Sequence, residues 1–250
     1  MQKNVQQNPE KNRPTVPEGL RIYAIGDIHG RIDLLDALLA KIDRDASTTK
    51  KRAIRVFLGD YIDRGAQSRQ VLDRLIGLQQ KDAEANIFLI GNHELVMREL
   101  LEKGDPFLLQ DWLRFGGRET LLSYGIELSQ FTKAPETLLP ALAAACPPEH
   151  RQFLNSLKLS TEFGSYFFCH AGARPGVALN KQAEKDLIWI RNEFLNYTGS
   201  FGKIIVHGHT ICEKVERHTN RINIDTGAYA TGCLTALGLE GSRWCLLQTR

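Results

Sequence analysis

Five short segments of the chain combine glycine with aspartate, asparagine or histidine, residue types that bind metal ions and transfer protons. In chain order they are residues 26–30 (GDIHG), 59–65 (GDYIDRG), 91–94 (GNHE), 170–172 (HAG) and 207–210 (HGHT). They contain five of the seven histidines. Each segment alone has an ordinary explanation, such as a helix N-cap or a buried histidine, but chance does not readily explain the ordered series. The series therefore predicts one functional site assembled from distant parts of the chain.

The chemistry open to these segments is the binding of divalent metal ions. Imidazole nitrogen binds Mn²⁺, Fe²⁺ and Zn²⁺, and carboxylate or amide oxygen completes a harder coordination shell. Asp27 and His29 are two positions apart, so an extended chain would direct both side chains to one face. The candidate ligands, enough for two ions, are Asp27, His29, Asp60, Asn92, His170 and one or both of His207 and His209.

The elements that must position these side chains follow from the apolar periodicity around them. Residues 21–26, 54–59 and 86–91 are predicted strands, and each ends at one of the motifs. Predicted amphipathic helices lie between them, one from about Ile32 to Ile42 and one over residues 68–80. This alternation predicts parallel strands with right-handed helical crossovers. Ligands of open α/β sheets bind beyond the carboxyl ends of the strands, where the motifs stand.

The rest of the chain has a predicted helical part followed by a part rich in predicted strands. Residues 95–157 form a predicted helical insertion, with candidate helices over 95–102, 106–124 and 135–157. Its place between two motifs makes it a candidate lid over the site. The last part is rich in predicted strands, which cover residues 166–170, 203–207, 221–225, 234–240 and 243–248. Residues 1–19 are predicted to be a disordered tail, and residues 20–250 one catalytic domain.

The composition argues against several other classes of protein. The 250 residues carry a net charge of +3, and this near balance of acidic and basic residues does not indicate a nucleic-acid or membrane partner. The five cysteines include no Cys-x-x-Cys pair and do not suggest a disulfide scaffold. No apolar run approaches the roughly 20 residues of a membrane helix, and the first residues lack the apolar core of a signal peptide. We therefore expect a cytoplasmic protein with no nucleic-acid or membrane partner.

In order, the motifs GDIHG, GDYIDRG, GNHE, HAG and GHT resemble the phosphoprotein phosphatase branch of the calcineurin-like metallophosphoesterases, which includes bacterial and phage serine/threonine protein phosphatases. The resemblance runs from about residue 20 to residue 239. It implies an α/β fold in which a central β-sandwich is flanked by helices in an αββα arrangement, with the helical insertion added. It also implies two divalent metal ions, with Mn²⁺ expected first and Fe²⁺ or Zn²⁺ as alternatives.

The resemblance assigns a role to each candidate ligand. The ligands that it implies are Asp27, His29 and Asp60 for the first ion and Asn92, His170 and His209 for the second. Asp60 would bridge the two ions, and His207 would support the site without touching a metal. The wider superfamily carries another histidine after the threonine, where this chain has Ile211. The first ion is therefore expected to keep an open position filled by water.

The resemblance also implies a mechanism. Hydroxide bridging the two ions would attack phosphorus directly, without a phosphoenzyme. His93 would be the general acid that protonates the leaving alkoxide, with Asp63 orienting its imidazole. Arg64 and Arg191 would bind phosphoryl oxygens, and Tyr229 is a candidate for lining the cleft.

Two residues near the motifs receive structural interpretations. Glu94 is assigned to favourable electrostatics at a helix start. Trp112 is assigned to packing within the insertion, in preference to a direct role with substrate.

The predicted substrate is a phosphoprotein or a small phosphoester, chiefly phosphoserine and phosphothreonine, with phosphotyrosine as a further possibility. The alternative enzyme is a symmetrical dinucleoside tetraphosphatase. Those enzymes usually resemble GDxQG in the first motif, and His29 in that place favours the monoesterase. A catalytically silent binding module is the third interpretation, and the complete set of motif residues argues against it.

Overall fold

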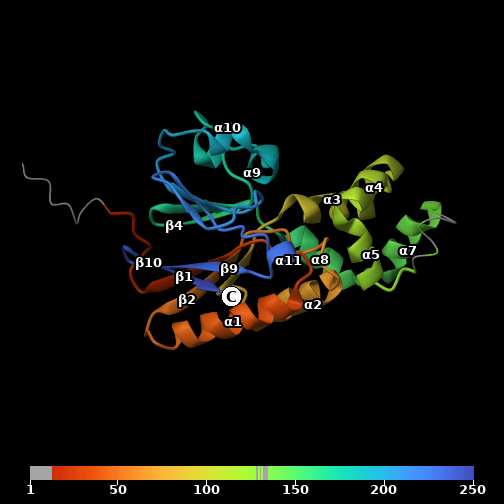
Figure 1. Cartoon of the computed structure of the whole chain (residues 1–250), viewed down its shortest axis with the longest axis horizontal. Helices are drawn as coiled ribbons and strands as arrows, with labels where there is room; N and C mark the ends of the chain where they lie inside the picture. The colour runs from red at the N-terminus through yellow and green to blue at the C-terminus, as the bar shows by residue number, and fades with distance from the viewer. Residues whose placement is uncertain (1–12, 128, 130, 132–134) are drawn as a thin grey trace, which may run out of the picture.

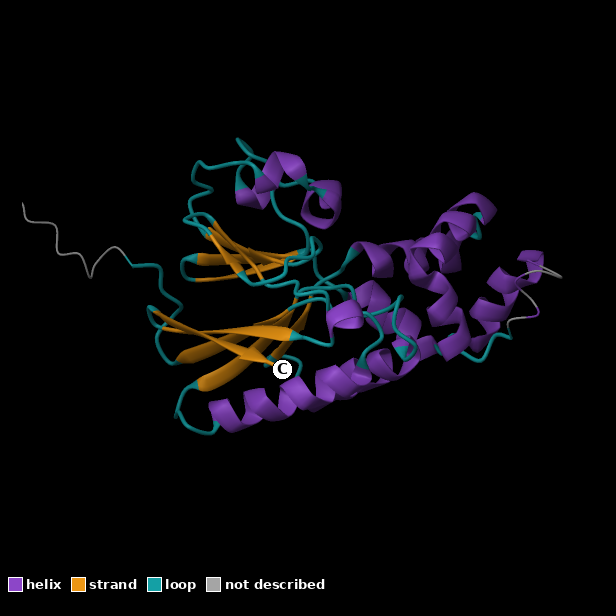
Figure 2. Ribbon diagram, in the orientation of Figure 1, coloured by secondary structure: helices purple, strands orange, loops and turns teal. Residues whose placement is uncertain are grey.

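Two five-stranded sheets pack face to face at the centre of the molecule (Figure 2). The computed structural model describes residues 13–127, 129, 131 and 135–250. The first sheet has the strand order β10-β9-β1-β2-β3, built from β10 (Arg243–Gln248), β9 (Thr235–Glu240), β1 (Leu20–Ile25), β2 (Arg52–Phe57) and β3 (Asn86–Phe88). The second has the order β4-β5-β6-β8-β7, built from β4 (Ser160–Phe163), β5 (Tyr166–Cys169), β6 (Ile204–His207), β8 (Arg221–Asn223) and β7 (Glu216–Arg217).

Strand β1 shows why the first sheet is apolar on both faces. Ile22 and Ala24 belong to the core between the two sheets, whereas Tyr23 and Ile25 belong to the core beneath the helices. Successive side chains of a strand point to opposite faces, so a strand covered on both sides is a continuous apolar run. β1 pairs in parallel with β2, and β2 with β3, as the alternation of strands and helices predicted.

Helices cover the outer faces of both sheets, which confirms the predicted helix-flanked sandwich (Figure 1). α1 (Ile32–Ala46) and α2 (Ser68–Lys81) lie against the first sheet. α1 buries Leu35, Leu38 and Leu39 at the spacing of one helix face. The short helices α9 (Glu184–Trp189) and α10 (Asn192–Leu195) lie over the second sheet.

The helical insertion packs into the apolar core of the molecule. Its elements are α3 (Asn92–Lys103), α4 (Pro106–Trp112), the π-helical turn η1 (Leu113–Gly117), α5 (Arg118–Ser123), the 3₁₀ turn η2 (Pro135–Thr137), α7 (Leu138–Ala145) and α8 (Pro148–Ser156). Leu109, Leu121 and Leu142 join the same apolar cluster as the buried face of α1. The predicted helix over residues 106–124 is interrupted at Gly116, whose φ of 111° is not helical.

Elements of two to six residues account for most of the other differences from the expected strands and helices, and the predicted helix over residues 135–157 is divided into η2, α7 and α8. The strands β4 and β7, the helices α9, α10 and α11 (Ala228–Thr231) and the 3₁₀ turn η3 (Leu179–Lys181) were not predicted. Segments this short carry too few residues for a periodic signal, so contacts with the rest of the fold decide them. The predicted tail of residues 1–19 lies mostly outside the described residues. Its last part is ordered, since Val16 is buried and its amide donates to the Gly241 carbonyl at 3.1 Å.

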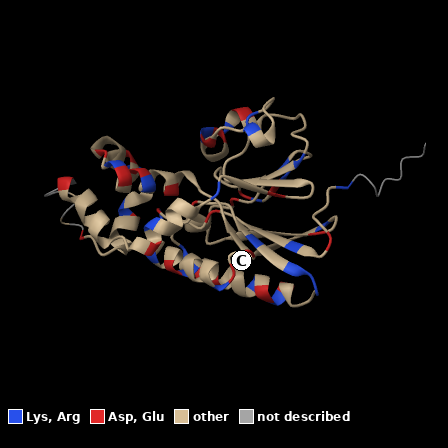
Figure 3. Ribbon diagram, turned by 180° about the vertical axis from the view of Figure 1, so that it is seen from behind, with Lys and Arg blue, Asp and Glu red and all other residues tan. Residues whose placement is uncertain are grey.

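Across the described part of the chain, no helix combines the length and apolar character needed to cross a membrane. Acidic and basic residues are interspersed along the helices in the view of Figure 3.

Candidate active site

The motif loops meet at the edge where the strands of both sheets end. Backbone hydrogen bonds join the first loop to the second: the amides of Ile28 and His29 both donate to the Asp60 carbonyl, at 3.0 and 2.9 Å. Within the described ranges, the non-glycine residues with left-handed backbone are His29, Asp60, Asp63, Arg64 and His209. All five belong to the motifs. Left-handed backbone is costly for such residues and tends to persist where a functional arrangement requires it.

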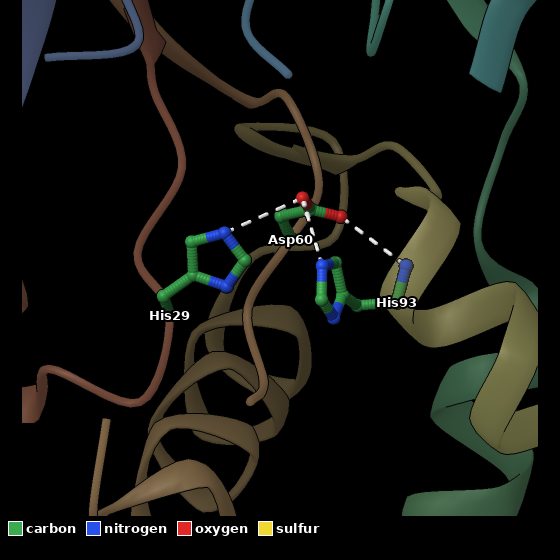
Figure 4. Close-up of side chains that lie close together, drawn as sticks. All are labelled: His29, Asp60 and His93. Atoms are coloured by element: carbon green, nitrogen blue, oxygen red, sulfur yellow. Dashed lines mark hydrogen bonds and ion pairs between the residues drawn. The ribbon is translucent and has the colours of Figure 1, made fainter. Parts of the chain in front are cut away.

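Asp60 lies at the centre of the site, and its two carboxylate oxygens face different partners. Oδ2 lies 3.5 Å from His29 Nε2 and 3.8 Å from His93 Nε2, as Figure 4 shows. Oδ1 lies 3.3 Å from His170 Nε2 on the other side. Burial by itself would raise the pKa of Asp60, but the facing imidazoles hold it below its usual range. A carboxylate in this position can serve two neighbouring cation sites at once.

A second group of donors stands on the Oδ1 side of Asp60. His209 Nδ1 lies 2.9 Å from Asn92 Oδ1 and 3.2 Å from His170 Nε2. His170 Nε2 is itself 3.1 Å from Asn92 Oδ1. Together with Asp60, the two histidines bring their nitrogen and oxygen atoms within 4.8 Å of one another, as do His29, Asp60 and His93.

The protonation of these histidines fits the binding of cations. His170 Nδ1 donates to the Leu58 carbonyl at 2.9 Å, and His29 Nδ1 donates to the Ile62 carbonyl at 2.8 Å. Burial lowers the pKa of His29 to about 3 and also lowers that of His170, so both rings are neutral. Their Nε2 lone pairs then face other acceptors, which is unfavourable unless a cation lies among them. Donation of the second ring nitrogen to a carbonyl is the usual arrangement of metal-binding histidine.

Asp27, expected to share an ion with His29 and Asp60, is a buried carboxylate close to that of Asp60. Its Oδ2 accepts the His209 amide at 3.0 Å, while its buried Oδ1 has no partner among the described residues. Burial and the nearby carboxylates of Asp225 and Asp60 raise the pKa of Asp27 well above its usual value. A group of buried acids with an unpaired oxygen again favours a cation.

Asp225 is a neighbour that the motif series missed. It follows β8, and burial is the main cause that raises its pKa to about 6. The signal was available in principle, because Asp225 also stands just beyond the carboxyl end of a strand.

His93 and Asp63 form a buried pair beside Asp60. His93 Nδ1 lies 2.6 Å from Asp63 Oδ2. Burial alone would lower the pKa of His93, but the Asp60 carboxylate and the Asp63 hydrogen bond raise it to about 9. The Asp63 contact therefore holds the imidazole in one orientation, with Nε2 facing Asp60 and Arg64.

The structure places Arg64 and Tyr229 beside this pair. Arg64 Nη2 lies 3.3 Å from His93 Nε2. The Arg64 guanidinium stacks over the Tyr229 ring at 4.9 Å, and the Tyr229 ring packs edge-on against His29 at 5.4 Å. Tyr229 therefore supports Arg64 as well as bordering the site. Arg191 reaches the site from the turn between α9 and α10, and its Nη1 lies 3.3 Å from Thr210 Oγ1.

Glu94 does more than favour a helix start. Its carboxylate accepts the amides of Asp60, Tyr61 and Ile62 at 2.8, 2.8 and 3.2 Å, and that of Gly91 at 3.0 Å. Glu94 thus fixes the backbone of the loop that carries Asp60. His207 belongs to neither donor group: its Nδ1 lies 3.1 Å from the Gly208 carbonyl, its ring packs against Phe194, and its buried Nε2 has no partner among the described residues.

A cavity of about 330 Å³ opens next to the His93 pair. Its charged and polar lining comprises the two arginines Arg64 and Arg191, together with Asn92, His93, Glu99 and Asp111. Phe115 from the insertion and Trp189 from α9 line its apolar part, and these residues are 63% and 45% exposed. An anionic group at the arginines would therefore have an aromatic wall beside it.

Comparison with known proteins identifies the family of the chain. Residues 20–224 match the family model of the calcineurin-like phosphoesterases. The chain belongs to that family. It is 27% identical over 225 residues to serine/threonine-protein phosphatase 2 of Escherichia coli (strain K12), a match that covers 86% of this chain and 90% of the relative.

Two further similarities widen the range of relatives of this calcineurin-like phosphoesterase. It is 27% identical to the asymmetrical bis(5'-nucleosyl)-tetraphosphatase PrpE of Anoxybacillus flavithermus, over 85% of this chain and 88% of the relative. The solved structure of a cold-active protein tyrosine phosphatase matches with a TM-score of 0.61 at 19% identity, over 93% of this chain and 81% of that one. At that identity, the match establishes the fold alone.

Proposed function

We propose that this chain is a metal-dependent phosphomonoesterase that hydrolyses phosphoserine and phosphothreonine in proteins, with phosphotyrosine as a secondary substrate. The observation that carries the proposal is the contact between an oriented acid and a phosphate-binding group. His93 is held by Asp63 at 2.6 Å and lies 3.3 Å from the Arg64 guanidinium. A phosphoryl group bound by Arg64 would place its leaving oxygen next to the proton of His93.

Each polar residue has a part in the proposed reaction. Arg64 and Arg191 bind the phosphoryl oxygens and neutralise their charge. His93 donates its Nε2 proton to the leaving alkoxide, and Asp63 keeps the other nitrogen protonated and the ring in place. Tyr229 holds the Arg64 guanidinium by stacking, so that the fork meets the phosphoryl group in one orientation.

The proposed cofactor is a pair of divalent cations, with Mn²⁺ the first candidate and Fe²⁺ or Zn²⁺ the alternatives. Asp27, His29 and Asp60 would hold one ion, and Asp60, Asn92, His170 and His209 would hold the other. When bound, the pair supplies activation of water and neutralisation of charge on the phosphoryl group. The shared carboxylate of Asp60 and the facing lone pairs of His29 and His170 support this assignment.

The test is hydrolysis of a phosphoserine peptide by metal-stripped protein with Mn²⁺ added back. We expect Mn²⁺-dependent release of phosphate and a loss of roughly 10²- to 10⁴-fold in kcat for His93→Asn, the range found for general acid catalysis. His218→Asn is the matched control, because His218 is a surface histidine with a 51% exposed side chain. Folded protein that releases no phosphate with Mn²⁺, Fe²⁺ or Zn²⁺ would overturn the proposal.

Hydrolysis of dinucleoside tetraphosphates is the second candidate. The relative from Anoxybacillus flavithermus carries the name of an asymmetrical tetraphosphatase. The aromatic wall of Phe115 and Trp189 beside the arginines could also hold a base. Diadenosine tetraphosphate separates the possibilities by its products: two ADP indicate symmetrical cleavage, and ATP with AMP indicates asymmetrical cleavage. A kcat/KM above that for phosphopeptides would favour this candidate.

The proposed partner is a phosphoprotein or small phosphoester, with neither nucleic acid nor membrane among the partners. The cytoplasm is the proposed compartment, and the five cysteines, all free thiols, are compatible with its reducing conditions.

A further inference from the structure

The Asp63 carboxylate is held by side chains of the insertion as well as by His93. Trp112 Nε1 donates to Asp63 Oδ2 at 2.7 Å, and Thr120 Oγ1 donates to Asp63 Oδ1 at 2.5 Å. All of these side chains are buried, and Asp63 and Thr120 have no measurable exposure. Both oxygens of the carboxylate are therefore occupied by donors that come from helices 49 and 57 residues further along the chain.

The insertion also forms hydrogen bonds with the backbone of the loop that carries Asp63 and Arg64. The Arg64 amide donates to the Gly116 carbonyl at 3.1 Å, and the Asp63 amide lies 3.0 Å from Thr120 Oγ1. Gly116 has a φ of 111°, and a Cβ there would come within 2.7 Å of the Arg64 backbone and side chain. Asp63 and Arg64 themselves have φ values of 72° and 66°. These hydrogen bonds fix the strained backbone of Asp63, which contacts His93, and of Arg64, which is the proposed phosphate-binding residue.

Gly117 has a different purpose in the same turn. A Cβ at this position would overlap the indole ring of Trp112. Glycine here lets the ring lie against the backbone, with its N–H directed at Asp63. The Gly116-Gly117 pair therefore allows close approach on both sides, to Arg64 at one residue and to Trp112 at the other.

We propose that Trp112 and Thr120 are positioning residues for the general acid. Their donated hydrogen bonds hold the Asp63 carboxylate in the plane and at the distance at which it orients His93. Without them, the carboxylate can rotate and the imidazole loses its fixed direction toward the leaving oxygen. The two residues touch neither the proposed cations nor the substrate, so they should affect proton donation and leave metal binding unchanged. The inference rests on the proposed phosphomonoesterase activity.

The experiment compares two phosphomonoesters that differ in their need for an acid. The p-nitrophenolate leaving group departs with little protonation, whereas the serine alkoxide of a phosphopeptide requires it. Trp112→Phe keeps an aromatic ring and removes the N–H, and Thr120→Val keeps the shape and removes the hydroxyl. Thr120→Ser retains the hydroxyl. Trp244→Phe is the control, because Trp244 is 45% exposed on the edge strand β10.

We expect kcat for the phosphoserine peptide to fall by roughly 10- to 100-fold in Trp112→Phe and in Thr120→Val, the size expected for one lost hydrogen bond to a charged group. The fall for p-nitrophenyl phosphate should be much smaller, and KM and bound Mn²⁺ should not change. Thr120→Ser should restore most of the activity. The two variants remove donors to different oxygens of Asp63, so if one does not fold, the other still tests the inference.

The possible outcomes separate the two proposals. Equal losses on both substrates, or a loss of bound Mn²⁺, would show a general structural effect and overturn the positioning role. If the ratio of the kcat values for the two esters changes in His93→Asn but stays constant in Trp112→Phe and Thr120→Val, that result would overturn the inference and leave the proposed function standing. A folded wild-type protein that hydrolyses neither ester would overturn the proposed function and the inference with it.

Discussion

The strand-end loops and the helical insertion contribute to one site in different ways. The loops supply charged and metal-binding side chains, and every non-glycine residue with left-handed backbone in the described ranges belongs to them. The insertion supplies neutral hydrogen-bond donors, Trp112 and Thr120, and the exposed ring of Phe115. The comparison teaches that charge and orientation are provided by separate parts of the fold. Changes in the loops should abolish chemistry, whereas changes in the insertion should adjust it.

The largest effect is expected at Asp60, where both donor groups meet. Asp60→Asn removes the negative charge that two cations would share, and we expect activity to fall by on the order of 10³-fold, since a bound cation contributes several kcal/mol to such a reaction. The measurements are phosphate release and bound Mn²⁺ by elemental analysis. Asp36→Asn is the control, because Asp36 lies on the surface of α1 and pairs with Arg74. Near-normal activity and metal content in Asp60→Asn would contradict the assigned role of the loops.

An intermediate effect is expected at Glu94, where the loops join the insertion at the start of α3. Glu94→Gln would direct an amide nitrogen at the backbone amides that the carboxylate now accepts. We expect the free energy of unfolding to fall by about 2–4 kcal/mol and Tm by roughly 4–16 °C. Thermal unfolding followed by circular dichroism measures the change. Glu102→Gln, at an exposed position of the same helix, should leave Tm unchanged. An unaltered Tm in Glu94→Gln would show that the Asp60 loop does not depend on this carboxylate.

The smallest effect is expected at the aromatic wall of the insertion. Phe115→Ala should raise KM for p-nitrophenyl phosphate by roughly 2- to 10-fold, because an aromatic contact contributes about 0.5–1.5 kcal/mol. Steady-state kinetics with this ester and with a small alkyl phosphate would test it, and only the aryl ester should be affected. Phe107→Ala is the matched control, since Phe107 is 78% exposed on α4 and does not line the cavity. A loss of kcat or of bound metal in Phe115→Ala would contradict the claim that the loops supply the chemistry and the insertion only adjusts it.

The sequence pattern by itself predicted the parallel strands, and the ordered motifs indicated the family, whose resemblance implied the sandwich. Strands β1 to β3 carry apolar runs that end at motifs, and α1 and α2 show helical spacing. Both signals are local, so the parallel sheet and the strand-end placement of Asp27, Asp60 and Asn92 could be predicted from them. The role of each motif residue came from the family resemblance, and the metal and catalytic roles of these residues remain predictions.

Only the tertiary structure decided which side chains support the site. The sequence assigned Trp112 to packing and gave no indication of a role for Thr120. Their contacts with Asp63 join segments 49 and 57 residues apart. Asp27 faces the His209 amide across 182 residues of chain, and no spacing rule predicts that partner. Local periodicity reports which face of an element is buried. The hydrogen bonds that orient Asp63 depend on how distant elements pack, and that information does not reside in any one segment of the sequence.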